Sequence, residues 1–222
     1  MRVLVAPDKF RGSATAAQVA AAIGSGLRRA RPDLEVVELP VADGGDGTVA
    51  AALAAGFTAV PVTVDGPTGE PVGTLFALHA GTAVIELADA TGLRRLPSGL
   101  APLTASTYGV GQVIRAALDH GATTIVLGLG GSSSTDGGAG MLQALGARLT
   151  DERGTDLPRG GAALAALARI DLAGLDGRLR AVRFEVACDV DHPLLGPSGA
   201  AAVFGPQKGA TPAEVALLDR AL

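Results

Sequence analysis

A segment rich in glycine and hydroxyl residues, GLGGSSSTDGGAG at Gly128–Gly140, is the feature that most constrains the fold of this chain. It follows an apolar run, Thr124–Leu129, that predicts a buried strand, and it precedes Met141–Leu145, which predicts a helix. A glycine-rich loop between a strand and a helix presents backbone N–H groups where the helix dipole favours an anion, which indicates a phosphate site. A tight turn without a ligand is the alternative interpretation.

The spelling of this loop excludes two common nucleotide-binding motifs. A dinucleotide fingerprint requires a glycine where Ser133 stands, and a Walker A loop requires a lysine that the segment lacks. Nucleotide binding at this loop would therefore be of another kind.

Composition argues against several classes of partner. The net charge is −4 and the basic residues are scattered, which disfavours nucleic acid as a partner. The sequence contains no run of about 18 apolar residues, the length that a helix needs to span a membrane. Hydrophobic residues make up 48% of the chain but aromatic residues only 3%, so the core is predicted to consist of Ala, Val and Leu. The single cysteine, Cys188, and the absence of a signal-peptide pattern favour a cytoplasmic protein.

The first predicted strand-to-helix loop carries two cations. Arg2–Ala6 predicts a buried strand, and Thr15 with Gln18 forms a capping-box pattern before an Ala-rich helix. Lys9 and Arg11 lie between them, at the carboxyl end of the strand, where α/β proteins bind ligands. Ordinary solvated surface charges are the alternative interpretation of these two residues.

The second such loop, Ala42–Thr48, carries two carboxylates among three glycines. It joins a predicted strand, Glu35–Val41, to a predicted helix, Val49–Ala55. Asp46 is placed to cap that helix, whereas Asp43 lies too far before it to bond its first N–H groups. We therefore expect Asp43 to hold a metal ion through its water shell or to accept a substrate hydroxyl.

The pattern changes from strand and helix to strand, turn and strand near Asp65. Val72–Leu78 and Thr82–Leu87 follow a turn-rich segment and predict a meander. This change predicts two units, residues 1–64 and residues 65–222, with the Gly/Ser loop in the second. An amphipathic helix is predicted there from five apolar residues on one face, Val110, Val113, Ile114, Ala117 and Leu118.

The last third of the chain contributes further expectations. Ala162–Ile170 predicts a helix, and Val182–Ala187 predicts a buried strand followed by Cys188 and Asp189. Cys188 is expected to be a small buried residue, whereas Asp189 is placed to accept a proton or hold a metal. A helix that starts with a capping box at Thr211 ends at Leu222 without a glycine cap, so a longer natural chain is expected.

Five segments taken together resemble the bacterial glycerate kinase family. They are APDKFRGS at 6–13, PVADGGDGT at 40–48, GGSSSTDGGAGMLQALGA at 130–147, ACDVDHPLLGPSGA at 187–200 and FGPQKGA at 204–210. The resemblance covers the whole chain but only about the first three-fifths of the family's length. It implies transfer of the γ-phosphoryl group of ATP, with Mg²⁺, to a hydroxyl of D-glycerate. It also implies an α/β fold with two domains, a flavodoxin-like (Rossmann-like) parallel-sheet unit and an inserted mixed-sheet α/β unit.

Phosphoryl transfer requires anion clamps and positioned acids, which leads to an assignment of roles. Asp189, Lys9 and Asp43 are predicted to be catalytic, with Asp189 as the proton acceptor. Arg11, Lys208 and Asp46 are predicted to bind the substrate, and Asp43 and Asp136 are alternatives for the metal. The predicted ATP-phosphate loop consists of Gly130, Gly131, Ser132, Ser133, Ser134, Thr135, Asp136, Gly137 and Gly138.

Two other functions stay open from the sequence. A non-catalytic fragment that binds glycerate or a nucleotide is one, because the resemblance covers only part of the family's length. A serine hydrolase using Ser132–Ser134 is disfavoured, because the chain lacks a G-x-S-x-G elbow and a convincing histidine partner. The sequence predicts neither the oligomeric state nor which hydroxyl of glycerate would react.

Overall fold

The computed structural model describes residues 1–10 and 13–222. In chain order the elements are β1 (Arg2–Val5), α1 (Ala16–Ala30), β2 (Glu35–Glu38), α2 (Thr48–Ala54), β3 (Thr58–Asp65), β4 (Pro71–His79), β5 (Thr82–Glu86), α3 (Leu87–Thr91), η1 (Leu93–Arg95), α4 (Tyr108–Asp119), β6 (Thr124–Gly128), α5 (Ala139–Ala144), β7 (Arg148–Thr150), η2 (Gly161–Ala166), β8 (Arg169–Asp171), η3 (Gly177–Ala181), β9 (Arg183–Ala187), α6 (Ala200–Phe204), η4 (Pro206–Lys208) and α7 (Pro212–Ala221), where η is a 3₁₀ helix. The predicted α/β class is confirmed.

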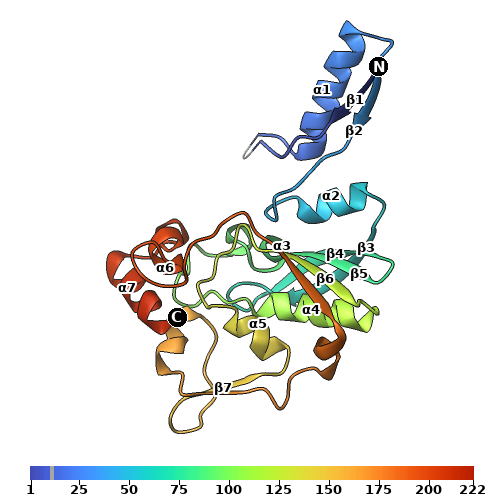
Figure 1. Ribbon diagram of the computed structural model, residues 1–222. Coiled ribbons are helices and arrows are strands. Elements are labelled where there is room, and N and C mark those ends of the chain that lie inside the picture. The colour runs from blue at the N-terminus through green and yellow to red at the C-terminus, as the bar shows by residue number, and fades with distance from the viewer. Residues whose placement is uncertain (11–12) are drawn as a thin grey trace.

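The N-terminal elements form a small unit of their own. Strands β1 and β2 pair in parallel, and α1 joins them and packs against both (Figure 1). The predicted capping box is confirmed, since the Thr15 side chain accepts from Gln18 N and the Gln18 side chain accepts from Thr15 N. Strand β1 lies where expected but is not a buried strand, because Val5 is the only one of its residues that is buried.

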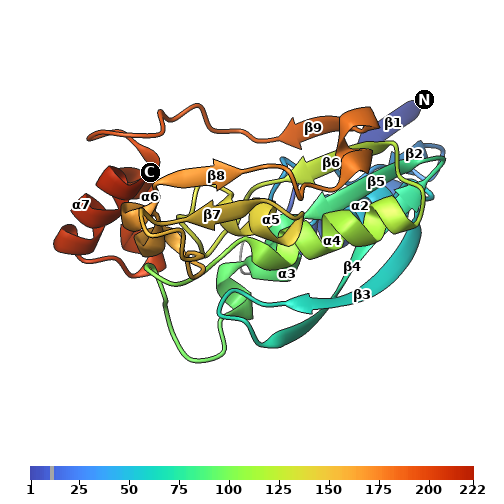
Figure 2. The ribbon, with the colours of Figure 1, turned by 90° about the horizontal axis from the view of Figure 1, so that it is seen from below.

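The larger sheet has five strands in the order β3-β4-β5-β6-β9 (Figure 2). The predicted meander is present as the antiparallel pairs β3·β4 and β4·β5, whereas β5, β6 and β9 are parallel. The predicted mixed sheet is therefore confirmed. In register, Glu86 pairs with Gly128 and Gly128 pairs with Ala187, so these three parallel strands end side by side.

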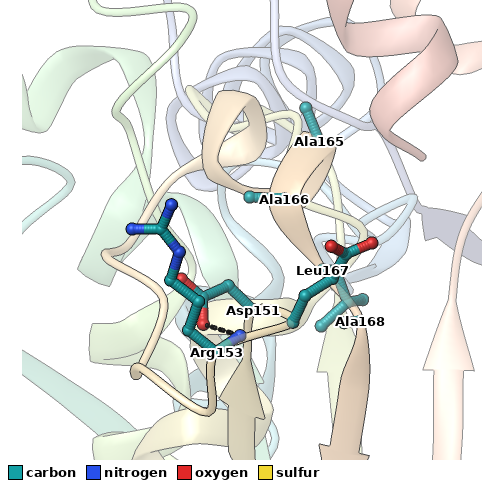
Figure 3. A pocket seen from close by; sticks show the side chains of 7 residues that line it. Asp151, Arg153, Ala165, Ala166, Leu167 and Ala168 are labelled. Carbon is teal, nitrogen blue, oxygen red and sulfur yellow. Dashed lines mark hydrogen bonds between the residues drawn. The ribbon is translucent and has the colours of Figure 1, made fainter.

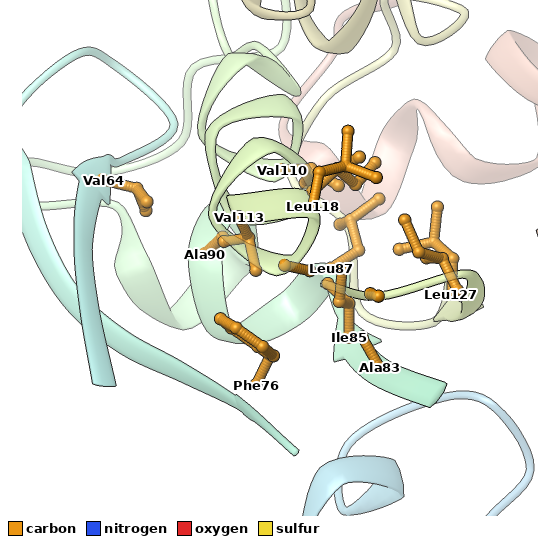
Figure 4. Close-up of a cluster of buried hydrophobic side chains, with 14 of the residues drawn as sticks. Val64, Phe76, Ala83, Ile85, Leu87, Ala90, Val110, Val113, Leu118 and Leu127 are labelled. Atoms are coloured by element: carbon orange, nitrogen blue, oxygen red, sulfur yellow. The ribbon is translucent and has the colours of Figure 1, made fainter. Parts of the chain in front are cut away.

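Helices cover both faces of this sheet. On one face α4 buries the five apolar residues predicted from its periodicity, together with Phe76 and Ile85 from the sheet (Figure 4). On the other face Val49 of α2 packs against Ala77 and Val84. Adjacent residues of β5, Val84 and Ile85, thus point into opposite cores, as the two-residue period of a strand requires.

Three predictions for the last third of the chain are wrong. Residues 161–166 form a 3₁₀ helix, and the chain then extends as β8, which pairs with β7 instead of continuing a helix to Ile170. Strand β9 is present but lies at the edge of the sheet with Phe184 and Val186 exposed, and Cys188 after it is also exposed. Apolar residues alone do not distinguish an edge strand from a central one, since burial depends on what tertiary contacts cover the strand.

Strand pairing shows where the chain passes from the two-stranded sheet to the five-stranded sheet. Strand β3 already belongs to the five-stranded sheet, and α2 packs on that sheet, so the change from one sheet to the other falls between β2 and α2. The division into domains at residues 64 and 65 stays a prediction.

Candidate functional site

Three loops converge at the carboxyl ends of β5, β6 and β9. Gly130 N, in the Gly/Ser loop after β6, donates to Gly44 O at 3.1 Å. Leu129 N donates to Ala187 O, at the end of β9, at 3.3 Å. The Asp43–Gly47 loop and the Gly/Ser loop, which are far apart in the sequence, are therefore joined at the sheet edge where α/β proteins bind ligands.

Glycines make this convergence possible. A methyl group on Gly130 would lie 2.5 Å from Gly45 Cα, and one on Gly128 would lie 2.5 Å from Gly44 O. Gly44 itself has a φ of 91° and packs against the backbone of Ala187, so a side chain there is excluded by conformation and by space. These glycines let three backbones approach one another as no other residue would.

Lys9 and Asp43 form an ion pair beside this contact. Lys9 Nζ lies 3.1 Å from Asp43 Oδ1 and 3.4 Å from Asp8 Oδ2. A methyl group on Gly45 would lie 3.6 Å from Lys9 Nζ and 3.8 Å from Gly130 Cα, which places the ammonium group next to the Gly/Ser loop. Lys9 and Asp43 thus lie together beside the point where the two loops meet.

The charges of this pair reinforce each other. Burial lowers the pKa of the Lys9 ammonium, but the Asp43 and Asp8 carboxylates outweigh burial and hold that pKa above its ordinary value. The hydrogen bond from Gly45 N and the Lys9 ammonium hold the pKa of Asp43 below its ordinary value. At neutral pH the site therefore presents a cation and a carboxylate together.

Asp46 pairs with an arginine that the sequence did not single out. Helix α2 begins after Gly47 without a side-chain cap, and Asp46 Oδ1 instead accepts from Arg94 Nη2 at 3.0 Å. Leu93 N donates to Gly131 O at 3.1 Å, so η1, which carries Arg94, is tied to the Gly/Ser loop. Arg94 was missed because an arginine in a short connecting segment gives no sequence signal.

The interior of the Gly/Ser loop is held by Asp136. This buried carboxylate accepts from the backbone N–H groups of Thr107, Gly138 and Gly140 and from the Ser106 and Thr107 hydroxyls. Both of its oxygens are occupied by these donors, which does not favour the predicted role of Asp136 as a metal ligand. Its hydrogen bonds instead join the loop to the starts of α4 and α5.

The remaining loop residues divide into a buried part and an open part. Residues Ser133–Asp136 are buried, and Ser133 Oγ donates to Thr91 O at 2.7 Å, whereas Gly131 and Gly137 are exposed. Within residues 1–10 and 13–222, no hydrogen-bond partner is found for the backbone N–H groups of Ser134–Gly137 or for the buried Thr135 hydroxyl. These donors are the groups that a phosphate loop would offer to an anion.

Lys208 reaches the same loop from the C-terminal part of the chain. It is 6% exposed, and its Nζ donates to Ser132 Oγ at 3.0 Å and to Ser134 O. Burial lowers the pKa of Lys208 to about 8, although the charge of Asp136 opposes the change. Lys208 therefore lies at the Gly/Ser loop, and its role in binding the substrate stays a prediction.

Two predicted residues are less well defined by the structure. Asp189 is exposed in the loop that follows β9, two residues after Ala187. Arg11 lies outside the described residues.

Glu86, a further residue of this edge, was not predicted. It ends β5, is 3% exposed, and its Oε2 accepts from Gly47 N at 3.0 Å and Val49 N at 3.3 Å. Burial and the nearby Asp89 raise the pKa of Glu86 to about 7, despite these two donors. The sequence pattern that could have indicated Glu86 is an acid at the end of an apolar strand. The same pattern is the basis of the prediction for Asp189.

A pocket is also present elsewhere in the molecule. It has a volume of about 580 Å³ and is lined by Asp151–Arg153 and Ala165–Ala168 next to β7 and β8 (Figure 3). It contains none of the residues of the convergent loops, so we do not assign it to the site. In the described part of the chain, no group of three or more His, Cys, Asp or Glu side chains is placed to hold a metal ion, and no helix is long and apolar enough to cross a membrane.

The fold and the convergent loops define an α/β protein whose glycine-rich loops meet at one edge of its sheet. A sequence model of the glycerate kinase family matches residues 3–222, and the chain belongs to this family. It is 50% identical to the glycerate kinase of Bacillus subtilis (strain 168) over 99% of this chain, and 46% identical to the glycerate 2-kinase of Escherichia coli (strain K12) over all of it. The crystal structure of a candidate glycerate kinase 2 from Salmonella typhimurium LT2 superposes with a TM-score of 0.89 at 49% identity, covering 100% of this chain and 61% of that one. This chain spans about 59% of the length of the two curated relatives.

Proposed function

We propose that this chain forms the phosphate- and glycerate-binding part of a glycerate kinase, which transfers the γ-phosphoryl group of ATP to D-glycerate. The observation that carries the proposal is the Lys9–Asp43 pair beside the junction of the Asp43–Gly47 loop with the Gly/Ser loop, in a chain of this family. Four parts of this proposal rest on the sequence alone and not on the structure: ATP, Mg²⁺, D-glycerate and a cytoplasmic location.

The residues divide the work of phosphoryl transfer between them. The N–H groups of Ser134–Gly137 would bind phosphate oxygens, and the Lys9 ammonium would hold the transferring group or the glycerate carboxylate. Lys208 would keep the loop in place and add positive charge. Asp189 would accept the proton of the attacking glycerate hydroxyl as its oxygen bonds to phosphorus and the bond to ADP breaks.

Asp43 is the residue that best fits a metal ion. Its Oδ1 is bonded to Lys9 and Gly45, but among the described residues no donor contacts its Oδ2. One carboxylate oxygen is a sufficient protein ligand for Mg²⁺, which otherwise keeps water and phosphate oxygens. When bound, Mg²⁺ would neutralise phosphate charge.

Release of ADP that depends on D-glycerate tests this function, with NMR identification of the phosphoglycerate formed. We expect Lys9→Gln to lower kcat/KM by about 10²-fold, since it removes one fixed charge from the transition state. Arg31→Gln is the matched control, because Arg31 is an exposed cation paired with Asp33 away from the loops. Equal rates for Lys9→Gln and wild type would contradict the proposed site, and absence of any glycerate-dependent release would contradict the function.

A further inference from the structure

Glu86 makes a contact that the proposed chemistry does not use. It lies at the last position of β5, in register with Gly128, and from there its side chain reaches the start of α2. Its Oε2 accepts two backbone N–H groups, from Gly47 and Val49, which belong to a segment 37 or more residues earlier in the chain.

The start of α2 depends on this contact because it has no cap of its own. The N-cap residue, Gly47, has a φ of 101° and no side chain, and neither Asp46 nor Thr48 bonds the first N–H groups of the helix. Unpaired N–H groups at a helix start are normally satisfied by a Ser, Thr, Asp or Asn at the N-cap. Glu86 supplies the missing acceptor from a neighbouring strand.

The loop before α2 is thereby fixed at both ends. Gly44 and Gly45 pack against Gly128 and Gly130, and Gly47 is held by Glu86. Asp43, which pairs with Lys9, lies at the start of this short segment. Any shift of Gly47 would therefore be passed to Asp43 through only three residues.

We propose that Glu86 is a positioning residue, which caps α2 from strand β5 and so sets the place of Asp43 and Lys9 against the Gly/Ser loop. The effect on catalysis rests on the proposed function, whereas the effect on the loop does not. Glu86 acts through backbone hydrogen bonds and is not itself assigned a contact with substrate.

The charges around Glu86 make its action dependent on pH. Asp89 of α3 and Asp46 of the loop face it as like charges, and Arg94 and Arg95 of η1 pair with Asp46 and Asp89 respectively. Burial raises the pKa of Glu86 from its ordinary value of 4.5 to about 7. Opening of the helix start returns the carboxylate to water, so opening becomes easier as pH rises from 4.5 to about 7.

Backbone amide exchange of Gly47 and Val49, measured by NMR, tests the proposal directly. We expect Glu86→Ala to lower protection at these two amides about five- to tenfold, as the loss of a helix cap does. Glu86→Gln keeps an oxygen acceptor and should retain most of that protection. At pH 5.5, where Glu86 is protonated in the folded protein, Asp89→Asn is the matched control, because Asp89 is a neighbouring acid that does not bond α2, and it should leave both amides unchanged.

Measurements of glycerate phosphorylation distinguish the effect of Glu86 on the position of the loop from its effect on catalysis. Glu86→Ala should reduce kcat/KM for glycerate by about tenfold or more, and Glu86→Gln should restore it to within about threefold of wild type, as expected for a displaced catalytic group. Unchanged protection in Glu86→Ala would overturn the proposal. A wild-type chain without glycerate-dependent ADP release would refute the proposed function alone, since amide exchange would still decide the role of Glu86.

The pH dependence of amide protection tests the proposal even if Glu86→Ala fails to fold. In wild type, protection at Gly47 and Val49, corrected for intrinsic exchange, should fall by about tenfold between pH 5.5 and 7.5, whereas in Glu86→Gln it should stay constant. The same pH dependence in both proteins would overturn the proposal.

Discussion

Lys208 shows at the scale of a single residue how a buried cation serves a loop. Its ammonium group has two acceptors, both in the Gly/Ser loop, and burial lowers its pKa from 10.5 to about 8. The folded protein therefore releases this proton at a lower pH than the unfolded chain, so the contribution of Lys208 to stability rises as pH increases from about 8 to 10.5 and is lost as pH drops from 10.5 to about 8.

We expect this pH dependence to appear when the stability of wild type is compared with that of Lys208→Met. The free energy of unfolding of wild type, relative to that of the variant, should rise by about 2 kcal/mol between pH 8 and pH 10, because each unit of pKa difference is worth about 1.4 kcal/mol. Urea unfolding of both proteins at several pH values measures it. A difference that does not change with pH would show that Lys208 has the same pKa in both states.

Asp189 is the residue whose predicted role rests on chemistry more than on contacts. We expect Asp189→Asn to lower kcat for glycerate phosphorylation by about 10²-fold or more, since a general base usually contributes that much. Because Asp189 is exposed, the substitution should leave thermal stability nearly unchanged. A loss of less than about tenfold would exclude the role of general base.

Residue types could be predicted from the sequence more readily than their roles. Asp43 was recognised because two carboxylates among three glycines are unusual in a turn, and Lys9 because it lies in a loop at the carboxyl end of a strand. The structure brings the two together. Asp136 also lies in a glycine-rich loop, yet its oxygens accept from donors that include the backbone N–H of Thr107, the residue before α4, a contact no local pattern encodes. Glu86 was missed because its partners lie across the fold at the start of α2.

At the scale of elements, the junction between loops depends on glycine at Gly130. A methyl group there would meet Gly45 Cα at 2.5 Å, and a backbone atom cannot turn aside as a flexible side chain can. We expect Gly130→Ala to push the two loops apart, lowering the free energy of unfolding by about 1–3 kcal/mol, as overpacking does. It should also lower kcat/KM for glycerate by about tenfold or more, because the anion site and Lys9 would separate.

Gly26 in α1 provides the contrasting glycine. Nothing lies within 4 Å of a methyl group at this position, and the residue is in the interior of a helix. Gly26→Ala should therefore stabilise the protein by about 0.5–1 kcal/mol without changing activity. Chemical denaturation of Gly130→Ala and Gly26→Ala measures the two changes in the free energy of unfolding. Equal changes at the two glycines would contradict the close packing of the loops.

Elements with local signals were predictable, and those set by distant contacts were not. The capping boxes at Thr15 and Thr211 fix where α1 and α7 begin, and both are present as predicted. The Ala-rich stretch at 162–170 has a helical composition, but pairing with β7 draws its end into β8. Strand β9 was recognised, whereas its exposure depends on an edge position that only the assembled sheet defines.

At the scale of the whole molecule, the two sheets differ in how well they are supported. The five-stranded sheet has helices on both faces and a continuous core around Phe76, Ile85 and Ile114. The β1–α1–β2 unit packs mainly on itself, and Leu4 and Leu39 are 60% and 47% exposed. It meets the larger sheet through the Gly44–Gly45 turn, and the Lys9–Asp43 pair ties the loop after β1 to the segment that carries this turn.

This difference predicts two levels of stability in the 222-residue chain. Two paired strands and one helix bury little apolar surface, so the β1–α1–β2 unit should open locally at a much lower free energy than global unfolding. We expect the amides of β1 and β2 to exchange at least about a hundredfold faster than those of β5 and β6 in hydrogen exchange measured by mass spectrometry. Lys9→Gln should widen this gap, because it removes the ion pair that ties the loop after β1 to the segment leading into the larger sheet, whereas Arg31→Gln should not. Equal protection of both sheets would mean that the loop contacts alone make the molecule a single cooperative unit, and the site would then be as rigid as the core.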